Sequence, residues 1–90
     1  MYRDWINSLK DLVGRARVQM RVGRLVHGNP GVHRYLTDRV SELKVDVGPG
    51  YRVYYSVRGT RILLLLVGGD KSTQHRDIEQ AICLSRNFEE

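Results

Sequence analysis

Two neighbouring segments alternate strictly between apolar and polar residues, and this pattern constrains the fold more than any other feature. They are residues 41–47 (SELKVDV) and residues 51–57 (YRVYYSV), and the turn residues GPG at 48–50 separate them. A period of two residues is that of a β-strand with one buried face. The sequence therefore predicts a β-hairpin, and the apolar face carries Leu43, Val45, Val47, Tyr51, Val53, Tyr55 and Val57.

A third strand is predicted at residues 61–67 (RILLLLV), after a tight turn at RGT, 58–60. This run is apolar on both faces, which is typical of a strand at the centre of a sheet. The three segments indicate a small antiparallel sheet of three or four strands.

The N-terminal third has a different period. Apolar residues at helical spacing predict helices over about 4–13 and 15–27, with Gly14 weakening the helix between them. The turn-forming residues HGNPG at 27–31 end the second helix.

A last helix is predicted over about 73–87, with Ser72 or Thr73 as its N-cap. The order helix, helix, strands, helix defines an α+β fold. We expect one domain over residues 1–90, in which two N-terminal helices pack on the antiparallel sheet and a further helix lies at the C-terminus.

The same alternation places a set of polar side chains on the opposite face of the hairpin, namely Arg52, Tyr54, Ser56 and Lys44. Lys71, in the loop after the last strand, adds a further cation. One interpretation is the ordinary solvated face of an antiparallel sheet. The other is a binding surface for a polyanion, which the net charge of +5 and the twelve arginines favour.

A second cationic group lies on the helix over 15–27, where Arg17, Arg21 and Arg24 fall within a narrow arc. These side chains either contact RNA phosphates or form a solvated helix flank.

Several classes of protein are not supported. One cysteine permits no internal disulfide and suits a reducing cytoplasm, and three scattered histidines do not form a metal site. The longest apolar run, 62–67, is too short to span a membrane, and the first ten residues lack the apolar core of a signal peptide. The segment GGDKST is not a phosphate-binding P-loop, because Leu65 and Asp70 stand where glycines are needed. We expect no cofactor.

Four segments in order, WINSLKD, RLVHGNPG, ELKVDVGPGYRVYY and LLLLVGGDKSTQHRDIEQA, resemble the RelE/ParE superfamily of bacterial toxins. The similarity is to the HigB-like addiction module killer branch of type II toxin–antitoxin systems, and it covers nearly the whole chain. Two departures are visible. Relatives usually carry a strand before the WINSLKD helix, and some ribonuclease members carry an aromatic residue or histidine near the C-terminus that SRNFEE lacks.

The resemblance implies a cytoplasmic toxin that enters the ribosome and cuts mRNA without a metal. A small antitoxin, often a helix-turn-helix protein, neutralises such toxins in a hetero-oligomer. The strand arginine of the family matches Arg52, the basic residue on the preceding strand matches Lys44, and the loop cation matches Lys71. Two alternatives stay open: a ParE-like inhibitor of DNA gyrase that is not an enzyme, and an inactive relative that only binds antitoxin.

Metal-free RNA cleavage needs a base for the 2′-hydroxyl, a cation for the phosphorane and an acid for the leaving oxygen. We assign Arg52 to the phosphorane, Lys44 to the base, and Tyr54 to orienting the base or the ribose. His75 is the candidate acid, and the other interpretation of His75 is a solvated residue in the first turn of the last helix.

Overall fold

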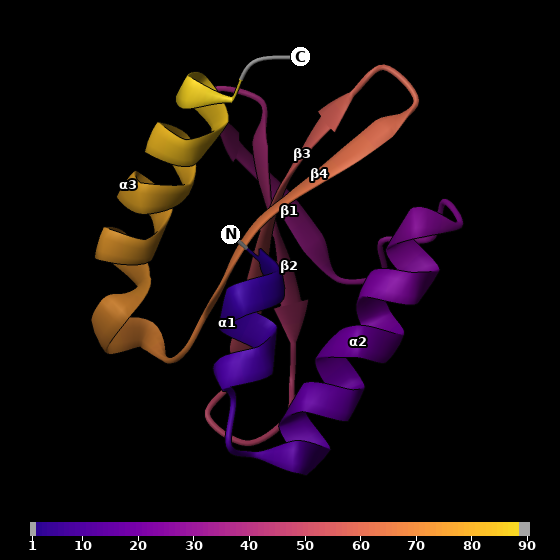
Figure 1. Cartoon of the computed structure of the whole chain (residues 1–90), viewed down its shortest axis with the longest axis vertical. Helices are drawn as coiled ribbons and strands as arrows, with labels where there is room; N and C mark the ends of the chain where they lie inside the picture. The colour runs from indigo at the N-terminus through magenta and orange to yellow at the C-terminus, as the bar shows by residue number, and fades with distance from the viewer. Residues whose placement is uncertain (1, 89–90) are drawn as a thin grey trace.

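The computed structural model describes residues 2–88, which form three helices and a four-stranded antiparallel sheet (Figure 1). The predicted α+β fold, with two N-terminal helices and one C-terminal helix, is confirmed. The elements in chain order are α1 (Tyr2–Ser8), α2 (Leu12–Val26), β1 (His33–Thr37), β2 (Val40–Val45), β3 (Tyr51–Arg58), β4 (Arg61–Gly68) and α3 (Lys71–Asn87).

The sheet is a meander in which every strand pairs with its neighbours in the sequence, in the order β1-β2-β3-β4. The predicted hairpin is β2–β3, and its register sets Lys44 opposite Arg52. Gly48 and Gly50 make the connecting turn with φ of +56° and +80°, values that glycine adopts without steric cost. β1 supplies the fourth strand at residues 33–37.

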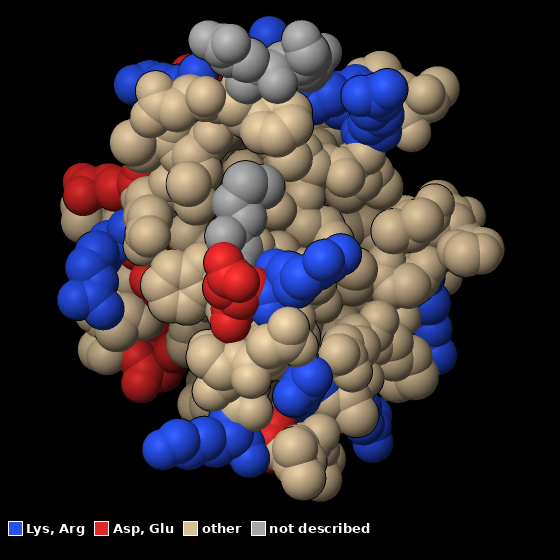
Figure 2. All heavy atoms as spheres, viewed as in Figure 1, with Lys and Arg blue, Asp and Glu red and all other residues tan. Residues whose placement is uncertain are grey.

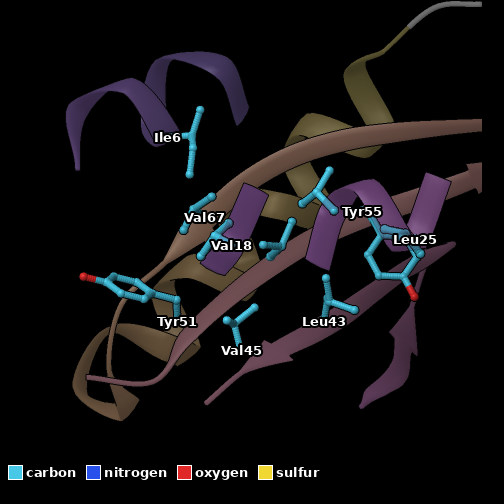
Figure 3. Packing of buried hydrophobic residues seen from close by; sticks show 10 residues of the cluster. Ile6, Val18, Leu25, Leu43, Val45, Tyr51, Tyr55 and Val67 are labelled. Atoms are coloured by element: carbon cyan, nitrogen blue, oxygen red, sulfur yellow. The ribbon is translucent and has the colours of Figure 1, made fainter. Parts of the chain in front are cut away.

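The prediction that β4 lies at the sheet centre is wrong, because β4 is an edge strand of the sheet. Its two-sided apolar character has another cause: α1 packs on one of its faces and α3 on the other. One core cluster joins Ile6 and Val18 of the N-terminal helices to the sheet (Figure 3). A second cluster joins Leu65 and Leu66 of β4 to Ala81 of α3.

Both interpretations of the Arg52 face placed its side chains at the outer surface of the sheet, and this placement is wrong for three of them. Arg52 is only 6% exposed, and Tyr54 and Ser56 beside it are fully buried. The reason is that α3 packs against β2, β3 and β4 on this side, so helices cover both faces of the sheet (Figure 1).

The N-terminal helices divide at residues 9–11 instead of at Gly14. Asp11 is the N-cap of α2, and its Oδ1 accepts a hydrogen bond from the Gly14 amide at 3.1 Å. Gly14 lies inside the helix. A Cβ at this position would stand 2.5 Å from Cε2 of Tyr51, so there is no room for a larger residue. The helix therefore approaches the sheet closely at this position.

The last helix begins two residues earlier than predicted. Its N-cap is Asp70, whose Oδ1 accepts a hydrogen bond from the Ser72 amide at 2.9 Å. A hydrogen bond from the Ser72 hydroxyl to the same oxygen is the first cause of the lowered pKa of the Asp70 carboxyl, and the bond from the Ser72 amide is the second. Lys71 is consequently a first-turn residue of α3 and not a loop residue.

No helix within residues 2–88 has the length and apolar character needed to cross a bilayer. The same residues contain no cluster of three His, Cys, Asp or Glu side chains arranged to hold a metal ion.

Candidate functional site

A cavity of about 360 Å³ lies between the first turn of α3 and strands β1 to β3. We call it the cationic pocket. It includes the three predicted cations Lys44, Arg52 and Lys71, which the fold brings together. Its lining residues are Val32, His33, Arg34, Glu42, Lys44, Arg52, Lys71 and Gln74.

The strand register explains why these side chains converge. Arg34 pairs with Glu42 across β1 and β2, and Lys44 pairs with Arg52 across β2 and β3, so the four side chains share the face toward α3. Opposite Arg52 on β4 stands Gly68, where a Cβ would come within 2.8 Å of Oδ2 of Asp77. This glycine lets the second turn of α3, which carries Asp77, lie close to the sheet.

Arg52 forms the floor of the pocket. Its Nη1 donates hydrogen bonds to the carbonyl oxygens of Gly50 and Gly69, both at 3.2 Å. Its Nε lies 3.8 Å from Oε2 of Glu42. The side chain therefore links the β2–β3 turn to the β4–α3 turn, and its Nη2 makes no hydrogen bond with a residue that the structure describes.

Glu42 is the functional candidate that the sequence reasoning missed. Its Oε1 accepts a hydrogen bond from Nε of Arg34, and its Oε2 accepts one from Nε2 of Gln74, both at 3.0 Å. The carboxylate is buried. A usable signal was present in the sequence, because a single glutamate on a face otherwise rich in cations is a predictable counter-ion.

The pocket has an excess of positive charge, since four cations and one carboxylate line it. Lys44 and Lys71 are exposed, and neither ammonium group has a hydrogen bond or ion pair to a residue within 2–88. Two unengaged ammonium groups beside two guanidinium groups suit a phosphate or another anion.

Two predicted site residues do not contribute to the pocket. Tyr54 is fully buried under α3, so its hydroxyl cannot touch a ligand in the cationic pocket. His75 has a 91% exposed side chain on α3 and lies 3.1 Å from Oε1 of Glu79. Its exposure agrees with the interpretation of His75 as a solvated residue, but because α3 begins at Lys71, His75 lies in the second turn and not the first.

His33 lines the pocket but belongs to the other face of β1. Its register partner is Leu43, a core residue under α2, and its Nδ1 lies 2.8 Å from the carbonyl oxygen of Gly31. Glu42 is thus the one titratable proton acceptor that the described residues place on the floor of the pocket.

Burial raises the pKa of the Tyr54 phenol, and the nearby Glu42 carboxylate raises it further. Burial likewise raises the pKa of Tyr2, Tyr51 and Tyr55. The Tyr54 hydroxyl has no hydrogen bond of normal geometry to any residue in the described part of the chain. Because the unfolded tyrosines ionise at about pH 10, unfolding releases protons above this pH, and stability falls as the pH rises through this range.

The change Tyr54→Phe tests this arrangement. At about pH 7 we expect the free energy of unfolding to change by less than about 1 kcal/mol, because the hydroxyl that is removed has no partner. Above about pH 10 we expect the free energy of unfolding to fall less steeply with pH than in the parent chain, because the variant lacks one phenol with a raised pKa. Urea unfolding followed by circular dichroism at neutral and alkaline pH measures both effects, and identical pH slopes for the two chains contradict the interpretation.

The three arginines of α2 do not act as one group. Arg21 donates hydrogen bonds to the backbone carbonyl oxygens of Lys44 at 2.9 Å, Pro30 at 3.0 Å and Val32 at 3.4 Å. It therefore fixes α2 to the start of β1 and to β2, and this structural role removes it from the predicted RNA-binding set. Arg17 and Arg24 are exposed and stay available.

The fold and the cationic pocket together define a small α+β protein with a cavity, lined mainly by cations, beside the first turn of its last helix. A protein of Haemophilus influenzae, described only as an uncharacterized protein, is 41% identical over 87 residues, which cover 97% of this chain and 88% of that protein. The chain belongs to the same family as this Haemophilus protein. No protein-family model matches the chain, and no solved structure matches it.

Proposed function

We propose that the protein is the toxin of a type II toxin–antitoxin system of the RelE/ParE kind, acting in the cytoplasm as a metal-independent, ribosome-dependent mRNA endoribonuclease. One observation supports this proposal above the others. Lys44, Arg52 and Lys71, which correspond to cationic positions of that superfamily, line one pocket together with a buried carboxylate.

The pocket is suited to a phosphodiester. The Lys44 and Lys71 ammonium groups contact the non-bridging oxygens of the phosphate, and Nη2 of Arg52 faces the same group from the floor. As the phosphorane forms, its added negative charge strengthens these charge-assisted hydrogen bonds. Fixed cations in a partly dry cavity stabilise this state more than bulk water does.

Glu42 takes the place of Lys44 as the base. The carboxylate accepts the proton of the RNA 2′-hydroxyl while the 2′-oxygen forms a bond to phosphorus and the bond from phosphorus to the 5′-oxygen breaks. Arg34 and Gln74 hold the two carboxylate oxygens in place. The departing 5′-oxygen receives a proton from the Lys71 ammonium, which takes over the role first assigned to His75.

An antitoxin is the expected regulatory partner, and α2 offers a surface for it. Leu12, Val13 and Met20 are exposed large apolar side chains on this helix. Together with Ala16 and Arg17 they surround a shallow hollow of about 420 Å³. On the face seen in Figure 2, the right-hand side over most of α2 shows Lys and Arg but no Asp or Glu.

Gyrase inhibition is the second candidate, and the positions of two side chains favour it. Tyr54 and His75 both lie outside the pocket, so neither of these two predicted side chains can transfer a proton there. The two functions differ in what they damage in a cell that expresses the protein. A ribonuclease leaves cut mRNA on ribosomes, whereas a gyrase poison leaves DNA breaks and a DNA-damage response.

The test uses the chain's three lysines. We expect Lys44→Gln and Lys71→Gln each to slow mRNA cleavage on purified ribosomes by about tenfold or more, because each removes a charge-assisted contact to the phosphate. Both side chains are exposed, so the fold is retained. Primer extension on the mRNA measures the cut ends.

Lys10→Gln is the matched control, because Lys10 is exposed and lies outside the pocket. It is expected to cleave at the parent rate. Equal losses in all three variants, or uncut mRNA with the parent protein, contradict the nuclease proposal.

A further inference from the structure

A second cavity, of about 530 Å³, lies at the opposite end of α3, where that helix ends beside the β1–β2 turn. We call it the end pocket. It shares no residue with the cationic pocket. From Gln74 in one pocket to Ser85 in the other, α3 rises by about 16 Å. The end pocket is lined by Tyr35, Asp38, Arg39, Arg58, Ser85, Arg86 and Phe88.

Among residues 2–88, three arginines and one aspartate line the end pocket. Nη2 of Arg86 lies 2.7 Å from Oδ2 of Asp38, and the Arg86 side chain is 67% exposed. The Arg39 side chain is exposed and forms no ion pair with another residue in the range 2–88.

Arg58 is held rigidly at the base of this cavity. Its Nε donates to Oγ of Ser56 at 3.1 Å, and its Nη2 donates to the carbonyl oxygen of Ser85 at 2.6 Å and to Oγ of Ser85 at 2.9 Å. Ser56 and Ser85 are themselves buried. A guanidinium fixed in this way contributes a positive potential with little loss of side-chain entropy when a ligand binds.

Two aromatic rings stand at the same cavity. Tyr35 is 66% exposed and Phe88 is 40% exposed, so both rings are accessible to a ligand. The guanidinium carbon of Arg58 lies 5.8 Å from the centre of the Phe88 ring. Exposed rings beside arginines are the combination that binds single-stranded nucleic acids, in which bases stack on rings and phosphates pair with cations.

The turn that carries Arg39 has an unfavourable backbone. Asp38 and Arg39 have φ of +51° and +65°, in the left-handed region where a two-residue hairpin turn ordinarily uses Asn and Gly. Glycine at position 39 would relieve this strain. The chain has a cation at that position despite the strain, and the cation lines the end pocket.

We propose that the end pocket binds a nucleotide, with the phosphate on Arg39 and Arg86 and the base against Tyr35 and Phe88. The nucleotide is either a free mononucleotide or one unit of a single RNA strand. The proposal does not depend on ribonuclease activity, because it concerns binding by the isolated protein at residues that the cationic pocket does not use.

The experiment measures binding by the purified full chain to two probes. One is a fluorescent oligoadenylate of about ten nucleotides, followed by anisotropy, and the other is AMP, followed by amide chemical shifts. We expect Arg39→Gly to weaken RNA binding by about tenfold and to reduce the slope of log Kd against log salt concentration by about one. The same variant has an unchanged or raised Tm, because glycine relieves the backbone strain.

For the rings, Phe88→Leu is expected to weaken binding by about fivefold or more through lost stacking. Its matched control is Trp5→Leu, since Trp5 has a comparable exposure of 39% and lies outside the pocket. The control for the charge is Arg76→Gln, an exposed arginine on the surface of α3.

The two probes separate the two sources of the nucleotide. If AMP changes the amide chemical shifts of end-pocket residues, and the oligonucleotide binds no more tightly than AMP, the ligand is a free nucleotide. Oligonucleotide binding that depends on Arg39 and Phe88 identifies an RNA strand. Parent-like affinity in Arg39→Gly and Phe88→Leu together, or equal losses in the two controls, overturns the proposal.

Discussion

Replacing Glu42 by alanine is expected to lower the free energy of unfolding by about 3–5 kcal/mol, which is the usual effect of removing one partner of a buried ion pair. The carboxylate is buried and interacts with Arg34, Gln74 and Arg52. Without it, the guanidinium of Arg52, only 6% exposed, loses the one carboxylate that residues 2–88 place within 4.0 Å of its nitrogens. The cost of that uncompensated buried charge is larger than the net value of the pair itself.

Chemical unfolding in urea measures the change, and Arg34→Ala is its control. Arg34 contacts the same carboxylate, but its side chain is 57% exposed, so its removal is expected to cost less than about 1 kcal/mol. The double variant Glu42→Leu with Arg52→Met is expected to recover part of the loss, because it removes both charges together. A loss below about 1 kcal/mol in Glu42→Ala contradicts the structural role of this carboxylate.

The same substitution, glycine to alanine, is expected to have opposite effects at two positions of α2. At Gly14 the new Cβ would stand 2.5 Å from both Oδ2 of Asp11 and Cε2 of Tyr51. Tyr51 is a core residue (Figure 3), and its hydroxyl donates a hydrogen bond to Asp11 at 3.1 Å. We expect a loss of about 1–3 kcal/mol, because neither neighbour can move without breaking this contact.

At Gly23 a Cβ meets no atom within 4 Å. Alanine there is expected to stabilise the protein by up to about 1 kcal/mol, since it favours the helix over the unfolded chain. Thermal unfolding of the two variants side by side measures the difference in sign. A stabilised Gly14→Ala chain would show that α2 lies farther from the sheet than the structure has it.

The strands and the fold class were predictable because their evidence is local. Alternation of apolar and polar residues identifies which side chains share a face, and the GPG turn between two such runs identifies a hairpin. Both inferences need only residues that are close in the sequence, and β2–β3 has the expected register.

The position of α3 was not predictable from the same evidence. Alternation says that Arg52 and Tyr54 share a face, but it does not say whether a helix covers that face. The signal lay in β4, whose apolar residues on both sides require two covering layers whether the strand is central or at an edge. The prediction that β4 is the central strand explained its apolar residues without a helix on the Arg52 face. In the structure β4 is an edge strand, and α3 covers that face.

The candidate site was partly predictable for the same reason. Lys44 and Arg52 pair across neighbouring strands, and Lys71 follows directly after the next strand, so their convergence follows from the hairpin. Alternation puts Glu42 on the same face as Lys44, but its role was missed because its contacts to Arg34 and Gln74 come from two other elements. Such contacts between distant elements have no local signature.

The order β1-β2-β3-β4 has a consequence for how quickly the native state forms. Each strand adds to the one made just before it, so no pairing requires the ends of a long segment to meet. The entropy lost in closing such short connections is small, and chains whose contacts are close in sequence fold faster than those with distant pairings. A newly synthesised copy can therefore assemble its sheet one hairpin at a time.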